Sequence, residues 1–222
     1  SGIEVLFLGA VRSDAMDPRI EDHAEVLVDW SARIDEGDDV LLSVGPDAHE
    51  LGVAVAEKVG ERGANLHTSY SSRELGRAYQ LAHGEDFDED PDHERALYEN
   101  ADVVLSIGGG RNPSEGADVP TDIRDAYSKA RQGIREARMD ADWVSTVHPT
   151  RSLAQQANMS FAEYQAFAYD AILRDWESLA DEMANMKDVL DDGSEVRIVK
   201  EQTDLTMSIE NRVAVNSAAS VA

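Results

Sequence analysis

Apolar positions follow two spacings in the first part of the chain. A continuous apolar run over residues 40–45 (VLLSVG) has the length of a strand that is buried on both faces of a sheet. Before it, a helix is predicted to begin at Pro18, with Asp17 as its N-cap, and to end at Gly37. The residues that recur every three or four positions in this helix are Ile20, Ala24, Leu27, Val28 and Ile34.

The alternation of strand and helix continues as far as residue 149. Further strands are predicted over residues 64–70 (ANLHTSY), 102–110 (DVVLSIGGG) and 143–149 (WVSTVHP). Helices are predicted over residues 47–60, 71–83, 92–100 and 121–137, with the capping pairs Asp47 and Glu50, Ser71 and Glu74, and Thr121 as a further cap. Strands that alternate with such helices form right-handed βαβ crossovers. We therefore predict an α/β fold, an open parallel sheet with helices on both faces.

The pattern changes after Thr150. A short helix and a Ser160–Glu163 capping box lead into a predicted long helix that runs to about residue 190. Its stripe of aromatic residues and methionines, which includes Trp176, Met183 and Met186, is typical of either a core or a partner surface. The sequence leaves both possibilities open.

The end of the chain has a period of two. Leu205, Met207 and Ile209 alternate with polar residues, and Val213 and Val215 repeat the alternation after a predicted turn at residues 210–212. An isolated hairpin is only marginally stable, so these residues are expected to be the first strands of a truncated, β-rich second domain. We divide the chain into residues 16–193, the α/β domain, and 194–222, the start of the second domain. Residues 1–15 precede Met16, contain a sequence resembling a protease site of expression vectors, and are expected to be a tag or leader remnant.

The amino-acid composition indicates the salt concentration and the cellular compartment in which the protein is expected to fold. The chain has 45 acidic and 20 basic residues, which gives a net charge of −25. Because salt screens such self-repulsion, the charge favours a halophilic protein, although an acidic surface for a basic partner is an alternative. No basic stripe for nucleic acid and no apolar run long enough to span a membrane is present in the sequence. The absence of cysteine is typical of a reducing cytoplasm.

The sequence lacks the common catalytic and ligand-binding motifs that we considered. IGGGRNPSEG follows a strand, but Pro113 replaces the third glycine of a dinucleotide fingerprint. DFDEDPDHERAL fails as a calcium loop, because Pro91 and Leu97 stand at positions that require glycine and glutamate. The sequence contains neither His-Glu-x-x-His nor Gly-x-Ser-x-Gly. His148 ends the fourth strand, where it could either hydrogen-bond the turn or face a cleft.

Several segments nevertheless resemble one family. MDPRIEDHAEVLVDWSARIDEGDDVLLSVG, DVVLSIGGG, WVSTVHPTRSLAQQANMSFAEYQAF and TDLTMSIENRVAVN, in this order, are similar to the N-terminal half of the leucyl-type metallo-aminopeptidases T and S, and the acidic composition is most similar to a haloarchaeal member. The resemblance covers residues 16–222.

The resemblance implies a parent enzyme that removes N-terminal residues from peptides with two divalent metal ions, Zn, Co or Mn, and that forms a homodimer. It also implies that the first metal ligand follows the last matching segment, so no ligand is assigned to this chain and it is expected to be inactive. Arg111, His148 and Asp204, at strand ends, are expected to face the substrate cleft. The competing hypothesis is a flavodoxin-like, non-catalytic module that binds a nucleotide or a protein partner.

Overall fold

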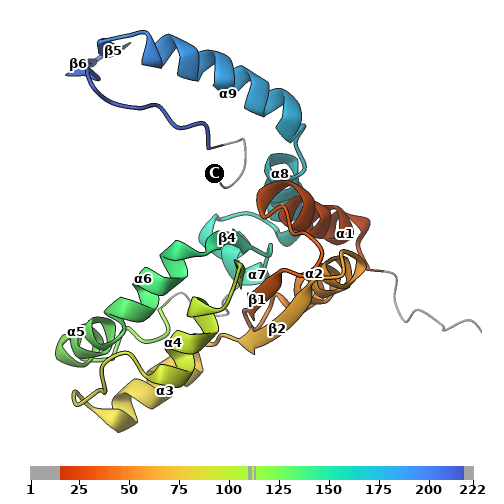
Figure 1. Cartoon of the computed structure of the whole chain (residues 1–222), viewed down its shortest axis with the longest axis vertical. Coiled ribbons are helices and arrows are strands. Elements are labelled where there is room, and N and C mark those ends of the chain that lie inside the picture. Colours follow the sequence, from red (N-terminus) through yellow and green to blue (C-terminus); the bar gives the residue numbers. More distant parts are fainter. Residues whose placement is uncertain (1–15, 110–111, 113, 218–222) are drawn as a thin grey trace, which may run out of the picture.

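The computed structural model describes residues 16–109, 112 and 114–217. Its central sheet has four parallel strands in the order β2-β1-β3-β4. These are β1 (Asp39–Val44), β2 (Asn65–Tyr70), β3 (Val103–Gly108) and β4 (Asp142–Val147), each close to a predicted strand. Figure 1 shows that helices connect them, so the prediction of an α/β fold is confirmed.

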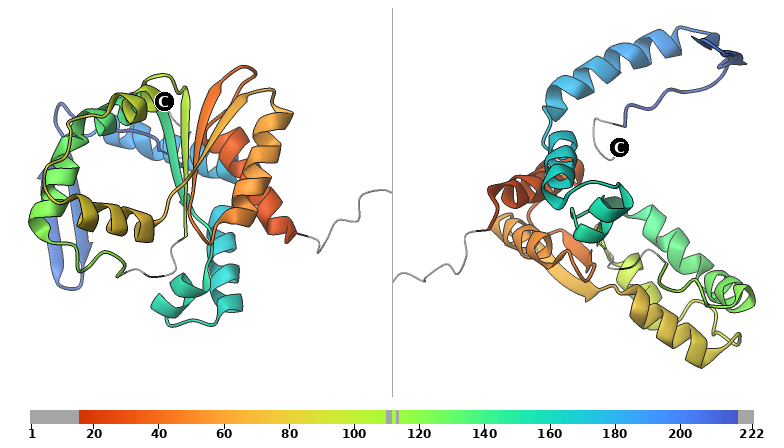
Figure 2. Two further views of the ribbon diagram at one scale, coloured as in Figure 1. Left: turned by 90° about the horizontal axis from the view of Figure 1, so that it is seen from below. Right: turned by 180° about the vertical axis from the view of Figure 1, so that it is seen from behind.

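One face of the sheet is covered by α1 (Pro18–Glu25), the π-helix η1 (Val26–Ser31) and α2 (His49–Glu61) (Figure 2). The Asp17 carboxylate caps α1 by accepting a hydrogen bond from the Arg19 amide, as expected. The opening helix departs from prediction in two respects, because it widens into a π-helix at Val26 and ends at Ser31 instead of Gly37. The buried residues of these helices pack on apolar strand residues and form the main core: Ile20, Ala24, Leu27, Val28, Leu51, Val55 and Val59 against Val40, Leu42, Val103, Leu105 and Ile107.

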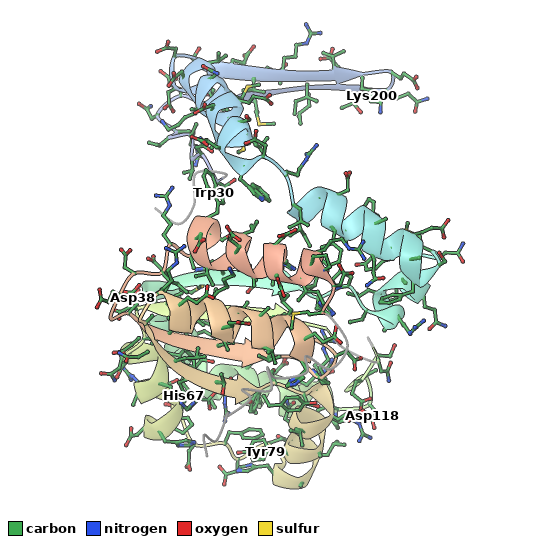
Figure 3. The ribbon with its side chains drawn as sticks, turned by 90° about the vertical axis from the view of Figure 1, so that its right-hand side faces the viewer. Trp30, Asp38, His67, Tyr79, Asp118 and Lys200 are labelled. Carbon is green, nitrogen blue, oxygen red and sulfur yellow. The ribbon has the colours of Figure 1, made fainter. Side chains whose placement is uncertain are left out.

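The opposite face lies toward α3 (Arg73–His83), α4 (Asp92–Glu99), α5 (Thr121–Ala130) and α6 (Gln132–Asp140). In Figure 3, the sheet separates α1 and α2 from the helix that carries Tyr79. Tyr79 contacts the rings of Phe87 and Tyr127, which joins α3 to α5. The helix predicted over residues 121–137 is divided at Arg131, and Asp90 of the acidic loop accepts a hydrogen bond from the Ile134 amide in the first turn of α6.

Three predicted caps are wrong. The N-cap positions of α2, α3 and α5 are Ala48, Ser72 and Pro120, and none makes a side-chain capping hydrogen bond. Before α2, the Asp47 amide donates to the Gly109 carbonyl, so a tertiary contact positions the start of the helix. The Ser160–Glu163 capping box of α8 (Phe161–Ile172) is confirmed in both directions.

The predicted long helix is also wrong, because the chain breaks after α8. Leu173 leaves the helical conformation, with ψ at 51°, and Asp175 caps α9 (Trp176–Asp191) by accepting from the Ser178 amide. No residue of α9 is buried, so its apolar stripe belongs to no core among the described residues. α8 itself follows the short helix α7 (Arg151–Gln156).

The terminal hairpin forms one strand earlier than predicted. β5 (Glu195–Lys200) pairs antiparallel with β6 (Thr203–Ser208), and the residues around Val213 and Val215 are not in a strand. Instead, the segment after β6 runs back alongside α9, where the Asn216 side chain donates to the Ala180 carbonyl. Figures 1 and 3 show the hairpin, with Lys200, far from the parallel sheet. Across residues 16–109, 112 and 114–217, no helix is long and apolar enough to cross a bilayer.

Candidate functional site at the carboxyl ends of the strands

The loops that follow β1, β3 and β4 meet at the carboxyl edge of the sheet. The Gly45 amide donates to the Ile107 carbonyl at 2.8 Å, and the His148 amide donates to the Gly108 carbonyl at 2.9 Å. A Cβ atom on Gly45 would lie 3.1 Å from the Ile107 oxygen, so this approach favours glycine. The strand order reverses between β1 and β3, and such a reversal is where open α/β sheets bind ligands.

A buried polar cluster lies at this edge on the α1 side. His23 of α1 is 1% exposed, and its Nε2 lies 3.0 Å from the Thr146 hydroxyl of β4. Tyr169 of α8 is 3% exposed and meets the His23 ring edge-on, with 6.2 Å between centroids. The Arg19 guanidinium lies over the Tyr169 ring, 4.7 Å from its centroid, and forms an ion pair with Asp17 at 2.6 Å.

Burial sets the protonation of this cluster. It lowers the pKa of His23 to about 4, and the neighbouring His148 contributes in the same direction. Burial also lowers the pKa of His148, although Glu50, Asp17 and Asp47 act against it. The pKa of Tyr169 is raised to about 12, mainly by burial and further by Asp17. Both imidazoles and the phenol are therefore neutral at pH 7.

The cluster has unused hydrogen-bonding capacity. Nδ1 of His23, Nδ1 of His148 and the Tyr169 hydroxyl are buried without a hydrogen-bond partner. Buried polar atoms are usually paired, so these three are unusual. The residues do not fit a two-metal centre, because nowhere in the described parts of the chain do three or more His, Cys, Asp or Glu side chains gather so that they could hold a metal ion.

Of the three predicted cleft residues, the two that the structure describes, His148 and Asp204, lie apart. His148 is 7% exposed and belongs to the buried cluster. Asp204 lies on β6, in the distant hairpin, where it pairs with Arg197 at 2.7 Å. Arg111 lies outside the described residues. His23 and Tyr169 were not predicted, because each stands within an apolar helical stripe; the polarity of His23 beside Ile20 and Ala24 was the available signal.

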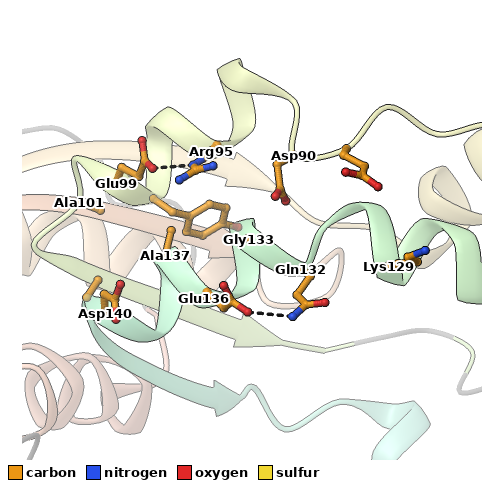
Figure 4. Close-up of a pocket in the computed structure, with 13 residues that line it drawn as sticks. Asp90, Arg95, Glu99, Ala101, Lys129, Gln132, Gly133, Glu136, Ala137 and Asp140 are labelled. Atoms are coloured by element: carbon orange, nitrogen blue, oxygen red, sulfur yellow. Dashed lines mark hydrogen bonds and ion pairs between the residues drawn. The ribbon is translucent and has the colours of Figure 1, made fainter.

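The two larger cavities on the other side of the sheet, among the described residues, differ in their lining. One, of about 610 Å³, opens between α4 and α6 (Figure 4). Its charges are mostly carboxylates, and Arg95 is already paired with Glu99 at 2.6 Å. The carboxylates that line it are Glu89, Asp90, Glu99, Glu136 and Asp140. The second cavity, of about 640 Å³, reaches the carboxyl edge itself and is lined by Gly45, Gly108, three serines of the sheet and Arg138.

Comparison with known proteins connects this fold to a group of proteases. A family model described as thermophilic metalloprotease (M29) matches residues 16–221. The structure of wild-type AmpT from Thermus thermophilus is similar with a TM-score of 0.68 and 18% identity, covering 87% of this chain and 54% of that chain. Apo cysteine desulfurase from Thermococcus onnurineus NA1 aligns with a TM-score of only 0.33 and 9% identity, over 57% of this chain and 26% of that one. No curated protein matches the sequence.

Proposed function

Because the chain belongs to the thermophilic metalloprotease family M29, we propose that it is the N-terminal α/β domain of a two-metal aminopeptidase that removes N-terminal residues from peptides. The observation that carries the proposal is the family match over residues 16–221, and the fold shared with AmpT supports it. The chain spans about half the length of AmpT. The proposal therefore concerns a longer parent protein in which this domain is one part.

In this proposal the catalytic metal ions, two divalent ions of Zn, Co or Mn, are held by the other half of the parent. This chain supplies no metal ligand and is inactive alone. Supporting this division, the described residues offer no suitable group of ligands, and His23 and His148 have no carboxylate that completes a site with them. The domain would then help to enclose the chamber in which the peptide is bound.

The test is an assay of residues 1–222 beside the complete parent, with leucyl-p-nitroanilide and cobalt or zinc in concentrated salt. We expect metal-dependent release of nitroaniline by the parent and none above background by the chain. Turnover by the chain alone would contradict the proposed division of labour. Failure of the metal-loaded parent to hydrolyse this and other peptide substrates would contradict the aminopeptidase assignment itself.

The parent is also proposed to be a homodimer. The outer helices support this, because Phe167 of α8 is 64% exposed and Val189 of α9 is 68% exposed. Burial of these exposed apolar side chains against a second copy would remove apolar area from water and so favour association. Light scattering on the parent in concentrated salt should give twice the mass of one chain, and a monomer mass at micromolar concentration would refute the assignment.

The charge supports a halophilic, cytoplasmic setting for the parent. With a net charge of −25, the folded chain repels itself unless salt screens it. We expect the thermal midpoint of unfolding to rise steadily as KCl increases from about 0.2 to 3 M, where the screening length falls to a few ångströms. A midpoint that is independent of KCl would remove the basis for this setting.

A further inference from the structure

A row of serine hydroxyls crosses the face of the sheet opposite His23. Ser43 of β1 pairs in register with Ser69 of β2 and with Ser106 of β3, and Ser106 pairs in turn with Ser145 of β4. Residues at one register position of a parallel sheet point to the same side, so the four strands present their hydroxyls in one line. We call these four residues the serine row.

Arg138 of α6 contacts this row from the helix layer that covers the same face of the sheet. Its Nη2 donates to the Ser145 hydroxyl at 3.3 Å and to the Ser106 hydroxyl at 3.5 Å, and its guanidinium lies 5.9 Å from the Trp143 ring centroid. Its Nε is buried without a hydrogen-bond partner. Thus the guanidinium is positioned over the sheet with only part of its donor set in use.

The charge of Arg138 is not neutralised by a neighbour. Among the described residues, no carboxylate oxygen lies within ion-pair distance of its guanidinium. By contrast, Arg131 at the N-cap of α6 is paired with Glu94 at 3.1 Å. In a chain with 45 acidic residues, a partly buried arginine without a carboxylate partner is an exception among the described residues.

The surrounding space has the size and the place of a binding site. The cavity of about 640 Å³ is lined by Ser43, Ser106, Ser145 and Arg138, and small-molecule sites commonly measure 300–1,000 Å³. It extends to Gly45 and Gly108, at the reversal of strand order. Among the described residues, three others that carry a charge line it: Arg73, Glu74 and Glu115, of which Glu115 lies 3.8 Å from the Arg77 guanidinium.

We propose that this cavity binds a small molecule through an oxyanion group, a carboxylate or a phosphate, which Arg138 and the three serines of the row that line the cavity hold together. A guanidinium offers planar, paired donors that match both groups, and the hydroxyls add donors below it. Serine hydroxyls can hydrogen-bond to water or to one another, so they do not by themselves require a charged partner. Burying part of a guanidinium against them costs free energy, which a bound anion would offset. The inference goes beyond the proposed peptidase function and does not depend on it.

The experiment follows the backbone amides of the serine row by NMR while the 1–222 chain is titrated. The probes are inorganic phosphate in one arm and acetate in the other, at constant ionic strength set with KCl. We expect saturable shifts of the Ser106, Gly108 and Ser145 amides in at least one arm. Saturation by phosphate alone, by acetate alone or by both supports the site and identifies the group that it takes.

Two substitutions on α6 separate a site from a general salt effect. Arg138→Gln should weaken binding at least tenfold, the effect of losing a charge-assisted hydrogen bond. Arg135→Gln, which removes the same charge from a side chain that donates to the Ser128 carbonyl outside the cavity, should leave binding unchanged. Equal effects of the two substitutions would overturn the proposal, as would the absence of saturation with both probes.

A second variant, which keeps the cation, guards against the case in which Arg138→Gln fails to fold. The double substitution Ser106→Ala and Ser145→Ala removes both hydroxyls that accept from Arg138 and should weaken binding at least threefold. The circular dichroism spectrum and the unfolding midpoint of each variant are recorded first. If Arg138→Gln does not fold, unchanged affinity in the double alanine variant overturns the proposal by itself.

Discussion

The two faces of the parallel sheet are built from the same strands and differ in almost every other respect. On the α1 side, Leu42 and Leu105 are completely or almost completely buried under helices. One residue further along each strand, Ser43 and Ser106 face a cavity. In sequence, β1 and β3 are continuous, largely apolar runs, so the sequence does not distinguish the two faces. The difference shows that the same strands can pack closely on one face and border a cavity near the carboxyl end of the other, next to the buried Leu41 and Val104.

The lining of each face follows from the helices above it. α2 alone contributes five buried residues, whereas neither α3 nor α4 contributes any. Close packing on the first face excludes water and lowers the pKa of His23, while the second face leaves room for polar groups. Stability is therefore expected to reside on one face and ligand contact on the other.

The largest test of this difference compares neighbouring residues of β1. Leu42→Ala should lower the free energy of unfolding by about 2–5 kcal/mol, because it opens a void in a fully packed core. Ser43→Ala should change it by only about 0.5 kcal/mol, because its side chain borders a cavity. Denaturant unfolding in constant concentrated salt measures both. Equal losses for the two variants would show that the faces are packed alike.

The pH dependence of stability tests how dry the packed face is. His23 has a folded-state pKa of about 4 against about 6.5 when unfolded, so the unfolded chain binds the proton more readily and stability falls as pH drops below 6.5. Between pH 7 and pH 5, this residue should cost about 2 kcal/mol of stability.

The free energy of unfolding is measured between pH 7 and pH 5 for the wild-type chain and for His23→Leu. The substitution should remove the loss of about 2 kcal/mol that His23 causes. His67→Gln, at an exposed position of β2, provides the matched control. The carboxylates contribute equally to all three proteins, so the difference between the curves isolates His23. Superimposable curves for wild type and His23→Leu would mean that water reaches this face.

The smallest expected effect concerns Gly45, where the two faces meet at the carboxyl edge. Gly45→Ala places a methyl group 3.1 Å from the Ile107 carbonyl oxygen and should cost about 1–2 kcal/mol. Gly76→Ala in α3, with open space around the added atom, should instead be neutral or stabilise the fold by up to about 1 kcal/mol. Thermal unfolding of the pair checks the sign. A stabilising Gly45→Ala would show that the loops do not approach each other this closely.

Much of the fold was predictable because its strands and helices differ strongly in apolar period. All four parallel strands follow from runs of strand length, and the Ser160–Glu163 box follows from a purely local pattern. The failures arise where distant contacts act. Asp47 does not cap its helix because the backbone there is held by Gly109, and the break at Leu173 has neither glycine nor proline to announce it.

The candidate site was less predictable, because it depends on register and on packing. His148 could be selected from its place after a strand, but its neighbour His23 lies 125 residues away in sequence and was hidden in an apolar stripe. Each serine of the row is visible in its own strand. Only the pairing of the strands brings the four into line, and only the fold places Arg138 above them.

The contrast between the faces can be measured directly because the chain contains no cysteine. Ser43→Cys and Val40→Cys each introduce one thiol into β1, the first on the cavity side and the second at a position that is 2% exposed. With a small thiol reagent under native conditions, we expect Ser43→Cys to react at least a hundredfold faster than Val40→Cys. Equal native rates for the two thiols would contradict the account of one packed face and a second face that is open at the cavity.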